Sequence, residues 1–244
     1  MYGREIAFTG GAHFSNFFST EFPVHEVRPT YYHMKPKTRN LVLKIVTHLG
    51  ALTPLALMLV DLLTGGYGPD PIREYTLRTG KTALVLLLVT LACTPVANLF
   101  NVRYILRLRR ALGLYTYLYV AIHFTVFIAI DYGFSLPLIR TALLQKRYAL
   151  AGLVAGILMT PLAITSTRGW IQRLGKRWQL LHRLVYVAAI VDVVHYIWLV
   201  KPGVPTPWIY AAVLAVLFLL RIKPIQTTLA TLLERVRSAL FSRS

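Results

Sequence analysis

The sequence predicts an all-α integral membrane protein, folded as a bundle of six transmembrane helices. The 244-residue chain is 56% hydrophobic and only 15% charged, whereas soluble domains carry about 25% charged residues. The apolar residues lie in long runs, and most Lys and Arg residues lie between these runs. Intrinsic disorder is excluded, because disordered chains are poor in apolar and aromatic residues.

Six apolar segments are suited to be membrane spans. A helix needs about 20 predominantly apolar residues to cross the hydrocarbon core of a bilayer. The first, second and fourth segments contain Pro54, Pro95 and Pro161, which transmembrane helices tolerate when neighbouring groups satisfy the freed backbone. The predicted spans are residues 41–63, 81–99, 112–131, 149–166, 180–200 and 207–222.

The basic residues predict the orientation of this bundle. Eighteen Lys and Arg residues lie on the side that holds both termini, and six lie on the other side. Cytoplasmic segments of membrane proteins carry an excess of Lys and Arg, so both termini are predicted to be cytoplasmic. The net charge of +18 therefore indicates contact with anionic lipid head groups. Nucleic-acid binding is not expected, since it needs basic residues gathered on one face of a soluble fold.

The segments outside the spans 41–222 suggest three further features. Residues 1–40 are expected to be a cytoplasmic extension, either disordered or the product of a mis-assigned start upstream of Met34. The basic tail 223–244 has apolar residues at helical spacing, which predicts a helix on the cytoplasmic membrane surface. The loop 132–148 is expected to form a helix on the opposite side of the membrane, which docks a partner protein or rests on lipid head groups.

Two kinds of site are excluded by what the sequence lacks. The single cysteine excludes an intrachain disulfide and cysteine-based zinc sites. No glycine-rich phosphate-binding loop is found, so electrons from NADPH would have to come through another polypeptide. The sequence also contains no recognisable internal repeat.

Four histidines lie within the predicted spans, where ionisable side chains are costly and usually functional. They are His48 in the first span, His123 in the third, and His182 and His195 in the fifth. The helical rise places His123 and His195 at similar heights in the outer half of the bilayer. Two imidazoles at one height on two helices are suited to bind a haem iron from both faces. His48 and His182 are expected in the cytoplasmic half.

Each of these histidines also has a simpler interpretation. A lone histidine in a span often only packs or forms a hydrogen bond. Thirteen residues on an ideal helix leave His182 and His195 about 140° apart, so they share a face only if the helix bends. Asp192, three residues before His195, is expected either to accept a hydrogen bond from that imidazole or to face a water-filled cavity.

The stretch LGKRWQLLHRLVYVAAIVDVVHYIWLVK (174–201) closely resembles the fifth-helix signature of a known family. This family comprises the haem-binding membrane subunits of periplasmic methionine sulfoxide reductase systems, within the ferric-reductase-like transmembrane superfamily. The resemblance covers about residues 40–223. Further similar motifs are LKIVTHLGALTP (43–54), RTGKTALVLLLVTLACTPVA (78–97), RRALGLYTYLYVAIHF (109–124) and ITSTRGW (164–170).

The resemblance implies an electron-transfer subunit of an oxidoreductase system in the bacterial inner membrane, not the catalytic subunit. Such a subunit passes electrons from membrane quinones through haem b to a periplasmic molybdopterin-containing partner, which reduces methionine sulfoxide in oxidised proteins. FMN is also associated with the family. The haem histidines of the family fall on His123, His182 and His195, and its first-helix histidine falls on His48.

The chain also departs from the pattern of its wider superfamily. NADPH oxidases carry a second histidine nearer the cytoplasmic end of the third helix, and this position falls near Arg110 here. A complete second bis-histidine site of that kind is therefore absent. His182 would need His48, water or another ligand to bind a second haem.

Two other functions compete with this interpretation. One is a ferric or other metal-ion reductase component of the same superfamily. The other is a small transporter whose histidines bind a substrate metal. A transporter should show inverted repeats or broken spans in matching positions, and neither is clear in the sequence.

Overall fold

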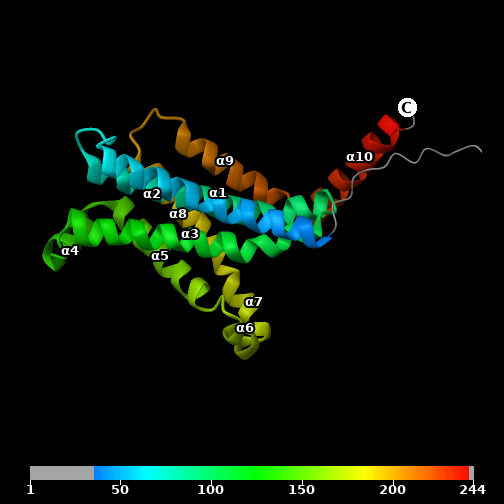
Figure 1. Ribbon diagram of the computed structural model, residues 1–244, viewed down its shortest axis with the longest axis horizontal. Coiled ribbons are helices and arrows are strands. Elements are labelled where there is room, and N and C mark those ends of the chain that lie inside the picture. The colour runs from blue at the N-terminus through cyan, green and yellow to red at the C-terminus, as the bar shows by residue number, and fades with distance from the viewer. Residues whose placement is uncertain (1–35, 242–244) are drawn as a thin grey trace, which may run out of the picture. The chain divides into compact units, whose positions relative to one another are not determined.

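The computed structural model describes residues 36–241, and this part of the chain consists of helices and their connections (Figure 1). Residues 1–35, which make up most of the predicted N-terminal extension, and residues 242–244 lie outside the described part. The elements in chain order are α1 (Pro36–Thr64), α2 (Pro71–Leu99), η1 (Arg103–Arg107), α3 (Leu108–Thr125), η2 (Val126–Asp131), α4 (Leu136–Gln145), α5 (Arg147–Ile164), α6 (Arg168–Leu174), α7 (Lys176–His182), α8 (Leu184–Leu199), α9 (Thr206–Leu219) and α10 (Lys223–Phe241).

Five of the predicted spans are helices long and apolar enough to cross a membrane, judged over residues 36–241. The sixth differs from the prediction. α9 has only 14 residues and ends at Leu219, whereas a span needs about 20. The chain then turns by 88° into α10, and α9 with the start of α10 is apolar and long enough for a sixth span only if this bent pair is counted as one.

The second span begins earlier than its hydropathy predicts, at Pro71 instead of residue 81. The side chain of Asp70 caps the first turn of α2, since its Oδ1 accepts a hydrogen bond from the Arg73 N–H at 3.1 Å. Proline is well suited to the first helical position because its missing N–H would be unpaired there anyway. Local capping therefore sets this boundary.

The two segments predicted to form surface helices are helical. The loop 132–148 contains α4, and the tail contains α10. α4 lies near the start of α5, whereas α10 follows α9 at the opposite end of the bundle (Figure 1). The helical spacing of apolar residues in these two segments was therefore a sound guide to their secondary structure.

The predicted fifth span consists of α7 and α8, with a break at Arg183. The N–H of Arg183 donates to the Leu180 carbonyl at 3.1 Å, and the N–H of Tyr186 donates to the Arg183 carbonyl at 3.0 Å. Hydrogen bonds between residues three apart are typical of a 3₁₀ turn, which is tighter than a turn of α-helix. His182 and His195 thus lie on opposite sides of a break, and their ideal-helix angle of about 140° does not apply.

Two helix pairs make the most extensive contacts in the described bundle, namely α2 with α3 and α5 with α8. One hydrophobic core lies where these pairs meet and includes Leu87 of α2, Ala188 of α8 and Leu214 of α9. A second core joins α1, α2 and α3 and includes Met58 and Tyr119. Histidines on α3 and α8 are therefore held by the best-packed part of the fold.

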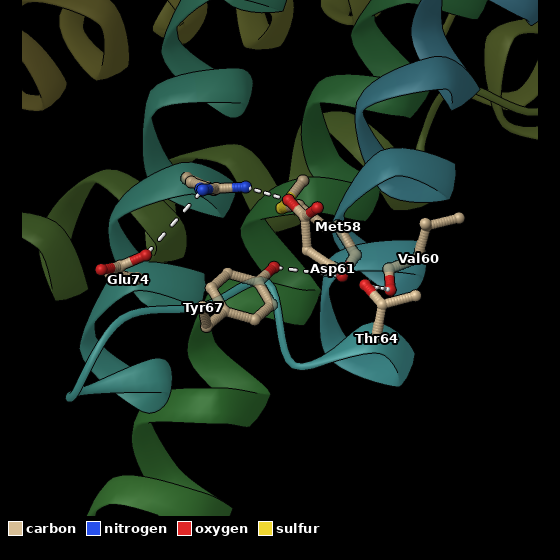
Figure 2. Close-up of polar contacts among 7 residues, drawn as sticks. Met58, Val60, Asp61, Thr64, Tyr67 and Glu74 are labelled. Carbon is tan, nitrogen blue, oxygen red and sulfur yellow. Dashed lines mark hydrogen bonds and ion pairs between the residues drawn. The ribbon is translucent and has the colours of Figure 1, made fainter.

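A small cluster of polar side chains holds the α1–α2 connection in place, as shown in Figure 2. The Arg78 guanidinium donates a hydrogen bond to Asp61 of α1 and lies 3.8 Å from the Glu74 carboxylate. The Tyr67 hydroxyl donates to the Met58 carbonyl at 3.1 Å. The Arg78 guanidinium also lies over the Tyr67 ring, 4.9 Å from its centroid. This cluster ties the end of α1 to the start of α2.

A buried tyrosine hydroxyl joins α3 to the backbone of α1 beside Pro54. Tyr119 is fully buried. Its hydroxyl accepts a hydrogen bond from the Leu55 N–H at 3.0 Å and donates one to the Ala51 carbonyl at 2.7 Å. An uninterrupted helix pairs these two backbone groups with each other. The hydroxyl therefore satisfies backbone groups of α1 and fixes α1 against α3.

An arginine satisfies the backbone carbonyl that Pro95 leaves without a helical donor. Proline has no N–H, so the carbonyl four residues earlier, at Leu91, loses its helical hydrogen bond. Nη2 of Arg221 donates to this carbonyl at 2.6 Å, and Nη1 donates to the Tyr186 hydroxyl at 2.6 Å. Arg221 lies between α9 and α10, so this contact links the α9–α10 turn to α2 and α8.

Replacing Arg221 by Met is expected to lower the free energy of unfolding by about 2 kcal/mol, because a buried carbonyl loses its donor. In a Pro95→Ala background the alanine N–H restores a helical donor to Leu91. The loss caused by Arg221→Met should then be about half as large. Thermal unfolding of the four variants in detergent measures this coupling, and equal losses in both backgrounds would show that the Leu91 contact contributes nothing.

Candidate functional site

His123 of α3 and His195 of α8 face each other inside the bundle. Their ring centroids are 6.4 Å apart, and their ring planes are inclined by 83°. Both residues lie toward the end of the bundle at which α2 and α5 begin. The structure therefore brings together the two histidines that the sequence places at equal height.

The imidazole of His123 is held by the first half of α2. Its Nδ1 lies 2.9 Å from the Thr76 carbonyl oxygen and 3.3 Å from the Thr79 hydroxyl. The ring also lies against Gly80, where a Cβ atom would stand only 3.1 Å from the ring Cε1. A side chain at Gly80 would thus compete with the ring for the same space.

The imidazole of His195 is held in the same way by α5. Its Nδ1 lies 2.6 Å from the Tyr148 carbonyl oxygen. A Cβ atom on Gly152 would stand 3.0 Å from both Cε1 and Nδ1 of the ring. Each histidine therefore meets a backbone carbonyl and, four residues further along the same helix, a glycine.

The two histidine sites repeat with the same sequence spacing. The carbonyl acceptor precedes its histidine by 47 residues in both sites. The glycine comes four residues after the acceptor in both, as Gly80 after Thr76 and Gly152 after Tyr148. The sequence itself shows no recognisable repeat because few other residues are identical at this offset of 72 residues. The repeat is one of backbone geometry.

These contacts determine which ring nitrogen is free. A carbonyl oxygen only accepts hydrogen bonds, so the Nδ1 atom facing it must carry the proton. The Nε2 atoms of His123 and His195 then keep their lone pairs, which is the form that binds metals. Imidazole–metal bonds are about 2 Å long, so two rings sharing one metal ion stand about 6 Å apart between centroids. The observed 6.4 Å fits this arrangement.

A pair of glycines one helical turn apart lets α5 approach both α8 and α3. Gly152 faces His195, and a Cβ on Gly156 would overlap the Phe124 ring. Phe124 follows His123 on α3, and the two rings are in edge contact with centroids 6.1 Å apart. This spacing of small residues is typical of close helix packing in membranes.

His182, which is expected to be a further haem ligand, lies at the other end of the bundle on α7. Its Nδ1 donates to the Trp178 carbonyl at 3.1 Å, and its ring stacks on the Trp178 ring with centroids 3.9 Å apart. Its Nε2 is buried and has no hydrogen-bond partner among the described residues. His182 therefore shares the tautomer of the facing pair, but the structure gives it no second imidazole.

His48, the remaining candidate ligand, is exposed on α1. Its Nδ1 is 2.7 Å from the Tyr115 hydroxyl, and the two rings are in edge contact. α1 packs on α2 and α3, whereas α7 packs on α6 and α8. No hydrogen bond or ring contact joins His48 to His182 in the part of the chain that the structure describes. His48 is not brought into a shared site with another histidine.

Of the two expectations for Asp192, a hydrogen bond to His195 is not what the structure shows. The Nδ1 proton of His195 goes to the Tyr148 carbonyl, and no hydrogen bond joins the Asp192 carboxylate to a described residue. The physical reason lies in α5, since Gly152 allows the imidazole to reach the helix backbone. Over residues 36–241, no three His, Cys, Asp or Glu side chains converge to hold a metal ion, so a two-histidine arrangement is what the site offers.

Sequence reasoning missed the four residues that position the two rings, Thr76, Gly80, Tyr148 and Gly152. Two of them act through backbone carbonyls, which every residue type carries. The glycines gave a weak signal, because GLVAG (152–156) has the small-residue spacing of membrane helix contacts. The π-helical turn η2, directly after α3, was missed as well; such turns are frequent at functional sites.

Comparison with known proteins places the chain in a class and then in a family. Residues 79–193 match the family model described as ferric reductase like transmembrane component. This segment includes His123 and ends two residues before His195, so the bundle contains a ferric-reductase-like transmembrane domain. The chain belongs to the family of MsrQ proteins, the heme-binding subunits of protein-methionine-sulfoxide reductase.

Three curated relatives, each named protein-methionine-sulfoxide reductase heme-binding subunit MsrQ, show the extent of the similarity. The protein of Xanthomonas euvesicatoria pv. vesicatoria is 39% identical over 75% of this chain and 87% of its own length. That of Rhodospirillum rubrum is 38% identical over 77% and 91%, and that of Herminiimonas arsenicoxydans is 38% identical over 78% and 88%. No solved structure matches the chain.

Replacing either glycine of the histidine sites by Ala is expected to lower the free energy of unfolding by about 1–3 kcal/mol, the usual effect of overpacking. The new Cβ in Gly80→Ala or Gly152→Ala must displace a ring from its carbonyl. Gly113→Ala in α3 is the matched control, because the nearest atom to its Cβ is 3.9 Å away. Thermal unfolding in detergent tests this, and stability losses no larger than that of the control would contradict the packing argument.

Proposed function

We propose that this chain carries electrons through haem b from membrane quinols to a periplasmic, molybdopterin-containing methionine sulfoxide reductase. The observation that carries the proposal is the pair His123 and His195, with both Nδ1 protons on backbone carbonyls and their rings 6.4 Å apart. The names of the MsrQ relatives, as heme-binding subunits, support the choice of haem.

In this proposal, His123 and His195 would hold one haem b through their Nε2 atoms. A haem iron held by two imidazoles accepts and donates single electrons, with a potential set by its ligands and their hydrogen bonds. The chain's own residues keep both Nε2 lone pairs available, because Thr76 and Tyr148 retain the Nδ1 protons. The two histidines belong to two separate helix pairs, α2 with α3 and α5 with α8, so the site forms only in the assembled bundle.

His182 is proposed as a ligand of a second haem, with its buried, unpartnered Nε2 as the supporting observation. A haem held by His182 would need water or another group as its further ligand, because His48 is bound to Tyr115. His48 is therefore the weakest of the four candidates. FMN remains part of the proposal through the family resemblance alone, without assigned contacts.

The proposed orientation has both termini in the cytoplasm, within the bacterial inner membrane. The charge distribution supports it, with eighteen basic residues on the side of the termini and six on the other. The His123–His195 pair then lies in the periplasmic half and His182 in the cytoplasmic half. We assign 41–222 to the haem-binding bundle, the tail 223–244 to the cytoplasmic membrane surface and α4 to the periplasmic surface, where a partner or lipid head groups would contact it.

A ferric or other metal-ion reductase component is the second candidate function. The observation that favours it is the match of residues 79–193 to the ferric reductase like family model. Both candidate functions use the same pair of histidines, His123 and His195, and differ only in the acceptor of the electron. The acceptor therefore decides between them.

His123→Ala and His195→Ala are each expected to remove the low-spin haem absorbance that appears on dithionite reduction, since each variant deletes an axial ligand. His48→Ala is the matched control and should retain this absorbance, because its imidazole is bound to Tyr115 on the outside of the bundle. Full haem content in His123→Ala or His195→Ala would refute the assignment of ligands.

The acceptor is tested in proteoliposomes supplied with a quinol and, outside, the periplasmic molybdopterin reductase with methionine sulfoxide. We expect sulfoxide reduction that falls at least tenfold with His195→Ala. Ferric citrate replaces the reductase in a parallel reaction. Reduction of ferric citrate without reduction of the sulfoxide would support the metal-reductase function and contradict the proposed one.

A further inference from the structure

The residue before the glycine differs between the two histidine sites. Thr79 precedes Gly80, and Ala151 precedes Gly152. Thr79 is fully buried, and its hydroxyl is 3.3 Å from Nδ1 of His123. Ala151 offers no polar side-chain atom to the other site. The backbone pattern is thus repeated, but a hydroxyl group is present on one side only.

The Thr79 hydroxyl is placed to accept a hydrogen bond from the His123 imidazole. Its Oγ1 lies 3.0 Å from the Tyr75 carbonyl and 2.9 Å from the Thr76 carbonyl. Both carbonyls only accept, so the single hydroxyl proton goes to one of them. The Oγ1 lone pairs then face the Nδ1 proton of His123, which is shared between the Thr76 carbonyl and the Thr79 hydroxyl.

This sharing weakens the hydrogen bond between His123 and its main acceptor. The Nδ1–O distance is 2.9 Å at Thr76 but 2.6 Å at Tyr148, where His195 has a single acceptor. A stronger acceptor on Nδ1–H makes the imidazole a more basic metal ligand. The geometry therefore makes His195 the stronger metal ligand of the two histidines and His123 the weaker one.

We propose that Thr79 is a positioning residue that holds His123 as the weaker axial ligand and thereby raises the reduction potential of the haem. This inference rests on the proposed function, in which His123 and His195 bind one iron. The Thr79 hydroxyl does not touch the iron and acts only through the imidazole. Axial ligand strength and hydrogen bonding are the means by which proteins set haem potentials.

The test uses Thr79→Val in the haem-loaded, full-length protein. Valine keeps the shape of threonine but leaves the whole Nδ1 hydrogen bond to the Thr76 carbonyl, so His123 becomes a stronger ligand and stabilises ferric iron. A redox titration followed by absorbance should show a lower midpoint potential for the component that His195→Ala removes. The low-spin ferric electron paramagnetic resonance signal should shift as well.

Two variants serve as controls. Thr79→Ser retains the hydroxyl and should keep the wild-type potential. Thr82→Val makes the same substitution one turn away, at a hydroxyl that bonds the Arg78 carbonyl at 2.8 Å, and should also leave the potential unchanged. Thr79→Ala, which also lacks the hydroxyl, should shift the potential in the same direction as Thr79→Val.

Three results would overturn the proposal. They are an unchanged potential and resonance signal in Thr79→Val, an equal shift in Thr79→Ser, and loss of haem from both hydroxyl-free variants, which would make the hydroxyl a requirement for binding. Failure of the proposed function itself is distinct, because it appears as haem retained in His123→Ala or His195→Ala whatever Thr79 does.

Discussion

The need to pair every N–H group away from water governs this structure. Within a bilayer an unpaired polar group costs several kcal/mol, and no solvent supplies a partner. Imidazole Nδ1–H groups on α3 and α8 meet this need with backbone carbonyls of α2 and α5. Because a carbonyl can only accept, the proton must lie on Nδ1. The contact that satisfies the buried N–H group therefore also leaves the lone pair of Nε2 free. Structural necessity and metal-binding competence thus follow from one hydrogen bond.

The prolines of the bundle show the same constraint acting on the backbone. Pro95 deprives the Leu91 carbonyl of its helical donor, and the Arg221 guanidinium replaces it. Beside Pro54, the Tyr119 hydroxyl bonds the Leu55 N–H and the Ala51 carbonyl. In both places a side chain from another helix completes the hydrogen bonding, so irregularities within one helix become contacts between helices. These contacts fix α1 against α3 and join the α9–α10 turn to α2.

The repeated histidine sites account for how one metal centre can be built from two helix pairs. Each pair supplies an acceptor, a glycine and an imidazole with equal spacing, so neither pair forms the centre alone. The hydroxyl of Thr79 breaks the equivalence, since it contacts His123 and has no counterpart beside His195. A hydroxyl beside only one of two otherwise similar histidines offers a direct way to set the strength of that histidine as a ligand. Membership of the MsrQ family agrees with a bundle organised around such a centre.

The sequence by itself determined the helical class, five of the spans, the two additional helices α4 and α10, and the equal height of His123 and His195. These follow from hydropathy, helical period and rise, which are local properties of the chain. Only the tertiary structure decided that Tyr148 and not Asp192 pairs with His195, and that His48 turns to Tyr115. Backbone acceptors carry no side-chain signature, and a contact across 47 residues depends on which helix faces overlap after packing. For the same reason the break at Arg183 and the turn after α9 became visible only in the folded chain.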